Sequence, residues 1–521
     1  MKNFLTFENV SKWPEGKNRH YYIISISLFL KILLLMSDNT VNNDGLLYIA
    51  AAQKFAAGHF NEWLKAFPMP FYPMLIGIVH FLISDWVTAA RTISIIFIVF
   101  TIIPVYLLTK ELFDRKAAFW ASLAFALAPF PNSLADTVIR DPGFIFFIAW
   151  AIYFALRTTQ TQEIYFLCMT ALFSIFSILF RIEGIILIIF FPVYLLVLYF
   201  IEEQKRTYLL KRSVLLIMIP LFLVTVFFIF GLNKPNSFNR SGEIYSEIKR
   251  LFNIGFLDSY YAISDNLKTL EQSSPVSGFK NNFAEIARHY MHLIYLVGLI
   301  ESFIIVLFPL YLLPLFFSFN RTVQTNRVFV SSVFLIYMLM VYYFLVKMDF
   351  ITSRYLSVPL LLVYPWIGAG IQRFFEYLAV KFPPKVFALF FLIFFILPVY
   401  KCVEQEFNED RSLMAAAKWV ADKSDEGKLR IITTDNRFLF YSGRDYYAAG
   451  NAFFVTGGDE LYNFDNNDNN YRKLEQVAIQ KKFDLVLIRI SSKKEAPQFE
   501  YFKKLREFKG RKNISYIFSS P

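Results

Sequence analysis

The chain has 521 residues, of which 56% are hydrophobic and only 18% charged, with 62 Phe against 19 Gly and 21 Pro. Soluble domains average about 25% charged residues, so this composition excludes an ordinary cytosolic enzyme, a disordered chain and a disulfide-rich secreted module, and it indicates a polytopic membrane protein. The net charge of +12 does not indicate nucleic acid, because no basic stripe with interleaved aromatics and no zinc-finger or helix-turn-helix spacing accompanies it.

Apolar runs in chain order predict the membrane spans, since about 20 apolar residues cross the hydrocarbon of a bilayer. Eleven spans are predicted, near residues 21–37, 87–109, 117–133, 143–157, 164–181, 184–200, 213–232, 292–318, 328–346, 355–372 and 386–400. A further apolar run at 71–83 is short and has Pro68, Pro70 and Pro73 at its start, which favours a re-entrant or interfacial helix.

The placement of Lys and Arg predicts the orientation of these spans. If the N-terminus is cytoplasmic and 71–83 does not cross, the basic loops 110–116, 201–212, 319–327 and 372–385 all lie inside, as the positive-inside rule requires. Counting 71–83 as a crossing would place the later basic loops outside. We therefore expect a transmembrane domain over 1–400 whose outer loops are 38–86, 134–142, 233–291 and 347–354.

The C-terminal tail, residues 401–521, differs in composition from the rest. It holds 21 Lys and Arg and 18 Asp and Glu among 121 residues, which is typical of a soluble domain. Its patterns predict helices at 411–422, 471–481 and 499–508 and strands at 429–434, 483–490 and 515–519. The tail is therefore expected to be a small α/β domain on the extracytoplasmic side, and the Asn- and Asp-rich stretch 459–470 is expected to be a loop.

The first outer loop contains a candidate catalytic acid. Asp44 stands at a predicted N-cap, Tyr48 follows one turn later, and Gly58 closes the helix. A cap alone explains Asp44, but a carboxylate held just above the bilayer can also act as a general base or ligate a metal.

Two later outer segments add charged residues. Arg140 and Asp141 precede Pro142, which is at the favoured first position of the next helix, so Asp141 is predicted to be its N-cap. Arg181 and Glu183 form a polar break between two apolar runs, where a turn requires neither charge.

The last outer loop contains Lys347 and Arg354. An Arg at the outer start of a helix is unfavourable for the helix dipole unless it binds an anion, and phosphate fits its planar fork. Snorkelling to lipid headgroups is the alternative. Within the spans, Lys31 and Glu301 are expected to face the bundle interior, because a charge in hydrocarbon is costly.

These segments, in this order and on one predicted membrane face, resemble the GT-C superfamily of polytopic glycosyltransferases, in particular its protein-mannosyltransferase-like and aminoarabinose-transferase-like members. The residues that carry the resemblance are Asp44 to Tyr48, Pro70 to Pro73, Arg140 to Pro142, Arg181 to Gly184 and Arg354 to Leu356. The chain departs from the protein mannosyltransferases, which have an Asp-Glu pair where Asp44 is followed here by Gly45.

The resemblance implies an α-helical membrane protein of about eleven GT-C-type helices with a small α/β domain, which transfers a sugar from a polyprenyl-phosphate donor with inversion. By matching position it implies catalytic roles for Asp44 and Asp141 and binding of the lipid phosphate by Arg181, Lys347 and Arg354. Tyr48, Arg140 and Glu183, which lie beside these residues in the same segments, are further substrate-binding candidates. No cofactor is certain, and a divalent metal (Mg²⁺ or Mn²⁺) at Asp44 and Asp141 is left open.

The expected location is the inner (plasma) membrane, and the expected partners are the lipid-linked donor and membrane lipid, with an unidentified acceptor and no nucleic acid. A transporter or flippase is the alternative, but it predicts paired broken helices and internal symmetry that the sequence lacks. A non-enzymatic scaffold would leave the charged outer residues unexplained.

Overall fold

The structure is a computed structural model of the chain. It describes residues 19–35, 40–67, 69–201, 208–216, 218, 258–273, 283–318, 325–407, 411–423, 429–444, 446, 454–455 and 470–520. Two compact units result, each described by itself: the first comprises 1–30, 94–135 and 140–400, and the second 31–93, 136–139 and 401–521.

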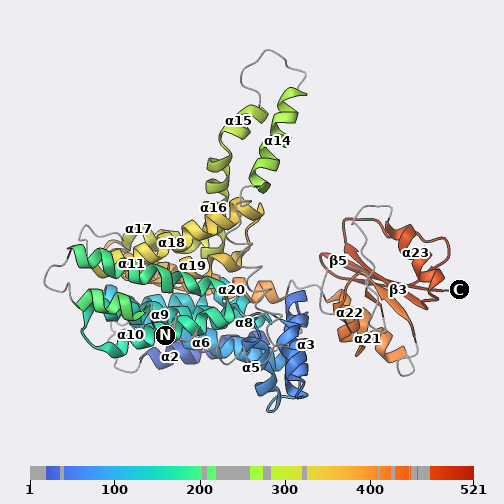
Figure 1. Cartoon of the computed structure of the whole chain (residues 1–521), viewed down its shortest axis with the longest axis horizontal. Coiled ribbons are helices and arrows are strands. Elements are labelled where there is room, and N and C mark those ends of the chain that lie inside the picture. The colour runs from blue at the N-terminus through green and yellow to red at the C-terminus, as the bar shows by residue number, and fades with distance from the viewer. Residues whose placement is uncertain are drawn as a thin grey trace. The chain divides into compact units, whose positions relative to one another are not determined.

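The first unit is a helical bundle (Figure 1). Its helices, some of which continue into the second unit, are α2 (Arg19–Leu35), α6 (Trp86–Leu112), α7 (Arg115–Leu127), α8 (Pro129–Asp136), α9 (Asp141–Gln160), α10 (Ile164–Phe180), α11 (Ile185–Ile201), α14 (Asp258–Gln272), α15 (Phe283–His289), α16 (Met291–Leu307), α17 (Leu312–Ser318), α18 (Thr325–Met348), α19 (Ser357–Lys381) and α20 (Pro384–Phe407). Short 3-10 turns lie at η2 (Ile182–Gly184), η6 (Pro309–Tyr311) and η7 (Ser353–Leu356).

Six helical segments of the described chain are long and apolar enough to span a membrane, or up to seven if the bent pair α15 and α16 forms one span. The chain is therefore a multi-pass membrane protein, but the predicted number of eleven spans is not confirmed. The segment 71–83 contains a ten-residue helix, α5 (Phe71–His80), which is shorter than a span, as expected.

Prolines account for two of the differences from the predicted spans. Ala128 adopts an extended conformation before Pro129 and separates α7 from α8, and Phe308, with φ of 73°, separates α16 from Pro309. A residue before proline is disfavoured in the helical region, so each apolar run forms two helices in place of one. The predicted span 213–232 lies mostly outside the described residues.

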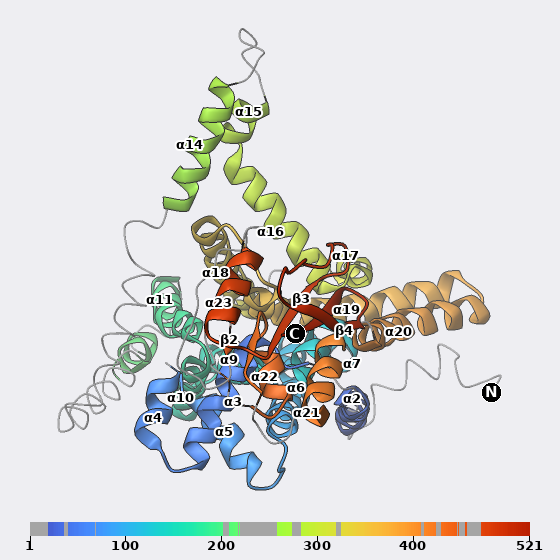
Figure 2. The same ribbon diagram turned by 90° about the vertical axis from the view of Figure 1, so that its right-hand side faces the viewer.

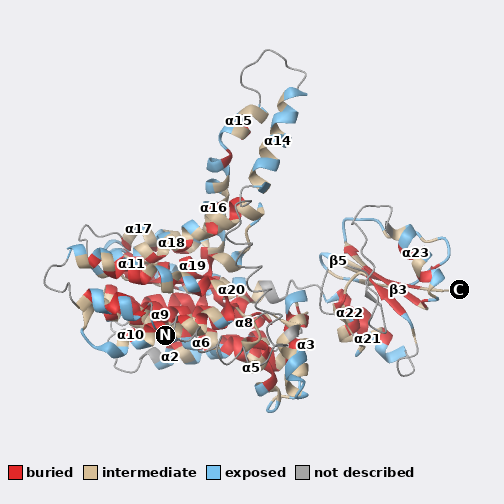
Figure 3. Ribbon diagram, viewed as in Figure 1, coloured by how far each residue is buried: buried red, intermediate tan, exposed pale blue. Residues whose placement is uncertain are grey.

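Small residues allow the bundle helices to approach closely. A Cβ on Gly143 of α9 would clash with the ring of Phe180 at the end of α10, and one on Gly370 of α19 would clash with the backbone of Pro314 in α17. Most of α9 is buried, whereas α14 and α15 are mainly exposed or intermediate (Figure 3). These two helices of the predicted loop 233–291 lie side by side beyond the end of α16 (Figure 2).

In the second unit, the segment predicted as the loop 38–86 forms three helices, α3 (Asn43–Ala56), α4 (Phe60–Ala66) and α5. Helix α3 packs against both of the others. The side chain of Asn42 caps α3 by accepting a hydrogen bond of 2.6 Å from the amide of Gly45. The prediction that Asp44 is the N-cap is therefore wrong: Asp44 lies within the first turn. The hydroxyl of Tyr441 accepts a 2.7 Å hydrogen bond from the amide of Val41 and holds the chain just before the helix.

The tail folds around a five-stranded mixed sheet of order β2-β1-β3-β5-β4, which confirms the expected small α/β domain. The strands are β1 (Ile431–Thr433), β2 (Phe454–Val455), β3 (Leu485–Ser491), β4 (Lys503–Lys509) and β5 (Asn513–Ser519), and the helices are α21 (Ser412–Lys423), α22 (Arg437–Tyr441) and α23 (Asn470–Gln480). One apolar cluster lies between the sheet and α21 with α22, and a second lies between the sheet and α23 (Figure 1).

One predicted helix of the tail is wrong. Most of the stretch 499–508 lies in β4 (Lys503–Lys509), which pairs antiparallel with β5 from Lys503 opposite Ser519 to Lys509 opposite Ile514. Its Lys, Arg and Glu residues have good helix propensity, but edge-strand pairing through a tight turn at Gly510 overrides that preference. The expected loop 459–470 lies almost entirely outside the described residues.

Candidate active site

The polar break between α10 and α11 places Arg181 and Glu183 inside the bundle. Arg181 is extended at the end of α10, and the 3-10 turn η2 then leads directly into α11. A Cβ on Gly184 would clash with the hydroxyl of Ser177, so only glycine allows this tight return of the chain. The turn therefore holds both charged side chains against α9.

Arg181 binds two carboxylates at once. Its Nη1 donates a hydrogen bond to Oδ1 of Asp141, while Nη2 and Nε donate to Oε1 of Glu183 at 2.5 and 3.2 Å. All three residues are buried, with exposed fractions of 7% for Arg181, 1% for Asp141 and 8% for Glu183. Asp141 is therefore an ion-pair partner in the first turn of α9, and the prediction that it is the N-cap is wrong, because Arg140 occupies that position.

The cluster is supported by aromatic side chains that the sequence analysis did not identify. The hydroxyl of Tyr337, on α18, donates a 3.2 Å hydrogen bond to the backbone carbonyl of Glu183. The rings of Tyr355 and Phe144 lie 5.3 and 5.9 Å from the guanidinium carbon of Arg181, within cation–π range. Tyr355 directly follows Arg354, but no pattern in the sequence distinguishes Tyr337 from the other aromatics of its span.

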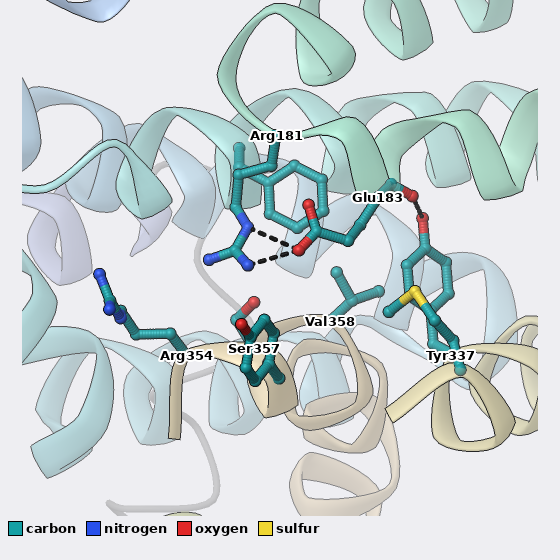
Figure 4. Close-up of a pocket in the computed structure, with 9 residues that line it drawn as sticks. Arg181, Glu183, Tyr337, Arg354, Ser357 and Val358 are labelled. Carbon is teal, nitrogen blue, oxygen red and sulfur yellow. Dashed lines mark hydrogen bonds and ion pairs between the residues drawn. The ribbon is translucent and has the colours of Figure 1, made fainter. Parts of the chain in front are cut away.

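Arg354 and Arg181 line the same small cavity, together with Glu183, Tyr337 and Tyr355. Figure 4 shows Arg354 on the side of the Arg181 guanidinium away from Glu183. The enclosed volume is about 10 Å³, enough for about one water molecule, so a larger ligand could bind only at the opening or after side-chain movement. Arg140 acts on the Glu183 carboxylate electrostatically and adds positive charge to this region.

Lys347 is not among the residues that line this cavity. Its ammonium lies 5.9 Å from the centre of the Tyr343 ring, one turn earlier on α18. Asp349, two residues later, has a positive φ of 56° and accepts a 2.5 Å hydrogen bond from the hydroxyl of Tyr295. Lys347 thus lies in the last turn of α18, before the segment that leads to Arg354.

Asp44 and Tyr48 belong to the second unit, and Asp141, Arg181 and Glu183 to the first. Asp44 is exposed in the first turn of α3. Tyr48 is 3% exposed and packs edge-on against Phe67 and Tyr72, with ring centres 5.0 and 5.3 Å away. The packing of Tyr48 determines which side of α3 is buried, whereas Asp44 is exposed to solvent.

The environment of Asp141 and Glu183 does not fit a divalent metal between the two carboxylates. Within the described ranges, no group of three or more His, Cys, Asp or Glu side chains could hold a metal ion. Asp141 and Glu183 both bind the guanidinium of Arg181, which has the position that a cation would need between two carboxylates. No step through a metal is therefore derived at this pair.

The two charged residues inside predicted spans differ in their environments. Lys31, on α2, is 1% exposed, in agreement with the expectation that it faces the interior of the protein. Glu301, on α16, is exposed on the protein surface, so the expectation that it faces the bundle interior is wrong.

The comparison with known proteins agrees with this architecture. Residues 67–230 match the family model described as dolichyl-phosphate-mannose-protein mannosyltransferase, whereas no protein of curated function matches the chain. The structure resembles ArnT from Cupriavidus metallidurans in its apo state, with a TM-score of 0.52, 11% identity, and coverage of 95% of this chain and 97% of ArnT.

A further match is the archaeal oligosaccharyltransferase AglB from Archaeoglobus fulgidus, in complex with an inhibitory peptide and a dolichol-phosphate. It has a TM-score of 0.44, 13% identity, and coverage of 91% of this chain and 69% of AglB, a likeness too weak to support an inference. Residues 67–230 are therefore similar to the protein mannosyltransferase family, and the whole chain shares the fold of ArnT.

Proposed function

We propose that the chain is an inverting glycosyltransferase that moves a sugar from a polyprenyl-phosphate donor to an acceptor on the extracytoplasmic face of the membrane. The observation that carries this proposal is the buried Asp141–Arg181–Glu183 cluster beside Arg354. Buried charges at this depth are costly and mark functional sites in membrane proteins. The description of the matching family, which names a dolichyl-phosphate-linked sugar, supports the same class of donor.

The donor phosphate would be bound by arginines at the opening of the cavity. Three hydrogen bonds to carboxylates use three of the five N–H groups of Arg181 and leave two for a ligand. Asp141 and Glu183 together carry more negative charge than Arg181 carries positive charge. The positive charges of Arg354 and Arg140 are therefore needed to give the region a net positive charge. Lys347 would assist at the outer loop, and charge-assisted hydrogen bonds to phosphate are among the strongest in proteins.

The reaction needs a base as well as an anion site. In the proposed step the acceptor heteroatom attacks the anomeric carbon, the bond from that carbon to the phosphate oxygen breaks, and polyprenyl phosphate leaves with the electron pair. Asp44 would take the acceptor proton, since it is an exposed carboxylate at the start of a capped helix. A single displacement from the side opposite the leaving group inverts the anomeric centre.

The second carboxylate has a different role in this proposal. Asp141 is almost fully buried and its Oδ1 is bound to Arg181, whereas its Oδ2 has no hydrogen-bond partner among the described residues. An ionised oxygen of this kind can accept a hydrogen bond from a sugar hydroxyl or stabilise positive charge that develops at the anomeric carbon. The packing of Tyr48 would hold in place helix α3, which carries Asp44.

The proposed topology follows the Lys and Arg bias: a cytoplasmic N-terminus and an extracytoplasmic domain over 401–521, in the inner (plasma) membrane. The donor is then consumed on the outer face, with the lipid chain in the bilayer beside the site.

The experiment that tests this proposal is turnover of polyprenyl-phosphate sugars by the purified full-length chain, scored as release of polyprenyl phosphate. Asp44→Asn and Arg354→Gln should each reduce turnover strongly, and Lys385→Gln, an exposed residue near the start of α20, is the matched control. A glycosylated product in which the sugar keeps the anomeric configuration of the donor would contradict the inverting step. Movement of intact donor across a vesicle membrane without sugar release would instead indicate the transporter alternative.

A further inference from the structure

The positive charge of the C-terminal domain is concentrated in one short segment. Six of the ten residues from 503 to 512 are Lys or Arg, and Glu507 is the only acidic residue among them. This segment contains the edge strand β4 and the turn to β5. Lys residues on an edge strand prevent edge-to-edge pairing with another sheet. This role explains exposed lysines, but it does not explain a cavity next to them.

A cavity of about 380 Å³ lies at the end of this segment. It is lined by Arg411, Ser412 and Ala415 from the start of α21 and by Phe508, Lys509, Gly510 and Arg511 from the β4–β5 turn. The volume is within the range of small-molecule sites. Three cationic side chains from segments about a hundred residues apart therefore surround one space, with Phe508 and Ala415 as an apolar wall.

The two sides of the cavity are fixed relative to each other. The hydroxyls of Ser412 and Ser515 form a buried hydrogen bond of 3.2 Å that joins the start of α21 to β5. The amide of Gly510 donates to the carbonyl of Asn513 at 2.9 Å and closes the turn. The cationic groups thus project from a rigid frame, which lowers the entropic cost of binding a ligand.

The charges in the cavity are available to an anion. Lys509 has a weak ion pair of 3.4 Å with Glu507, but neither Arg411 nor Arg511 has an ion-pair partner among the described residues. Both arginines are exposed. Two guanidinium forks and an ammonium around one space are the chemistry that recognises a phosphate group.

The chain connection limits the distance between Arg411 and the end of α20. The span Pro384–Glu404 is the N-terminal part of α20, which ends at Phe407, only four residues before Arg411. Four extended residues cover at most about 14 Å, so Arg411 lies no farther than that from the end of α20. The phosphate groups nearest to the end of a membrane span are those of the lipid headgroups.

From these observations we infer that the cavity between α21 and the β4–β5 turn binds the headgroup of an anionic phospholipid and anchors the C-terminal domain to the membrane surface. The apolar wall of Phe508 and Ala415 would face the glycerol part of the lipid. This inference does not depend on the proposed sugar transfer.

The test is arginine footprinting with phenylglyoxal on the full-length chain in nanodiscs, followed by peptide mass spectrometry. We expect Arg411 and Arg511 to react several-fold more slowly in phosphatidylcholine with phosphatidylglycerol than in phosphatidylcholine alone. Arg472, exposed on α23 on the other face of the sheet, is the internal control and should not change. Lys509→Gln should weaken the protection, whereas Lys473→Gln should not.

Other results would overturn the inference. Equal reactivity in both nanodiscs would show that no anionic lipid binds, and equal protection of Arg472 would reveal general shielding by the charged surface. Protection by inorganic phosphate in phosphatidylcholine nanodiscs, as strong as that by phosphatidylglycerol, would assign the cavity to a soluble phosphate compound in place of the lipid.

Discussion

Tyr337 donates its hydroxyl hydrogen to the backbone carbonyl of Glu183 and thereby connects α18 to the turn that carries the buried ion pairs. Both groups are buried, and Tyr337 is only 1% exposed. The bond fixes the position of the 3-10 turn and, through Glu183, that of the Arg181 guanidinium. The Tyr337 hydroxyl can therefore influence the geometry of the proposed phosphate site through Glu183.

The variant Tyr337→Phe should lower kcat with little change in KM for the acceptor. It leaves one buried carbonyl oxygen without its hydrogen bond, at a cost of about 1–3 kcal/mol, and about 1.4 kcal/mol in the barrier is a tenfold change in rate. Steady-state kinetics measure the change in rate, and a thermal unfolding curve measures the change in stability. Tyr377→Phe, at an exposed tyrosine that pairs with Lys381, is the control. Unchanged kinetics would show that the bond serves folding alone.

Replacing Arg181 by Lys should abolish turnover although the charge is retained. Lysine lacks the planar fork and cannot bond to Asp141 and Glu183 simultaneously, and breaking a buried ion pair costs about 3–5 kcal/mol. If the loss arises from unpaired carboxylates, Arg181→Lys combined with Glu183→Gln should recover part of the thermal stability. The melting temperatures of the wild type, Arg181→Lys and the double variant decide this, and a double variant less stable than Arg181→Lys would contradict the coupling.

The sequence predicted the class of fold because its signals are local. Apolar length located the six helical segments that are long and apolar enough to span a membrane, although eleven spans were predicted, and alternating patterns located α21, β1, α23, β3 and β5 in the tail within a few residues. The errors occur where tertiary context overrides a local preference. Phe308 and Ala128 break apolar runs that look continuous, and β4 is a strand although its composition favours a helix.

The candidate site was predicted only in part. Arg181, Glu183 and Arg354 were selected as outer-loop charges, and the structure brings all three to one cavity. That Arg181 pairs with both carboxylates follows from the packing of α9 on α10, which residue spacing cannot show. Tyr337 was missed because one tyrosine in an aromatic-rich span has no distinguishing local pattern.

Activity should persist in excess EDTA. The guanidinium of Arg181 lies between Asp141 and Glu183 and bonds to both, so Mg²⁺ or Mn²⁺ could bind between these two carboxylates only by displacing it. The measurement is the turnover number before and after prolonged chelation, with residual metal determined in the same sample. Loss of activity that is restored by Mg²⁺ or Mn²⁺ alone would contradict this prediction and would bring back a metal role for Asp44 and Asp141.

The last prediction concerns the stability of the C-terminal domain in acid. Asp435, after β1, is nearly buried, which by itself would raise its pKa, but hydrogen bonds and charges from Arg437 and Arg489 outweigh burial and hold the pKa of this carboxyl below its usual value of 3.8. A depressed folded-state pKa means that the ionised carboxylate stabilises the fold fully above about pH 4, and that this contribution is lost as the pH falls through the lowered value.

Asp435→Asn should therefore destabilise the full chain by about 3 kcal/mol at pH 7, and the difference from wild type should shrink below pH 4. Chemical unfolding from pH 7 to pH 3 measures it, with Asp422→Asn, at an exposed carboxylate of α21, as the control. A difference between Asp435→Asn and wild type that stays constant across this range would show that Asp435 acts through packing and not through its charge.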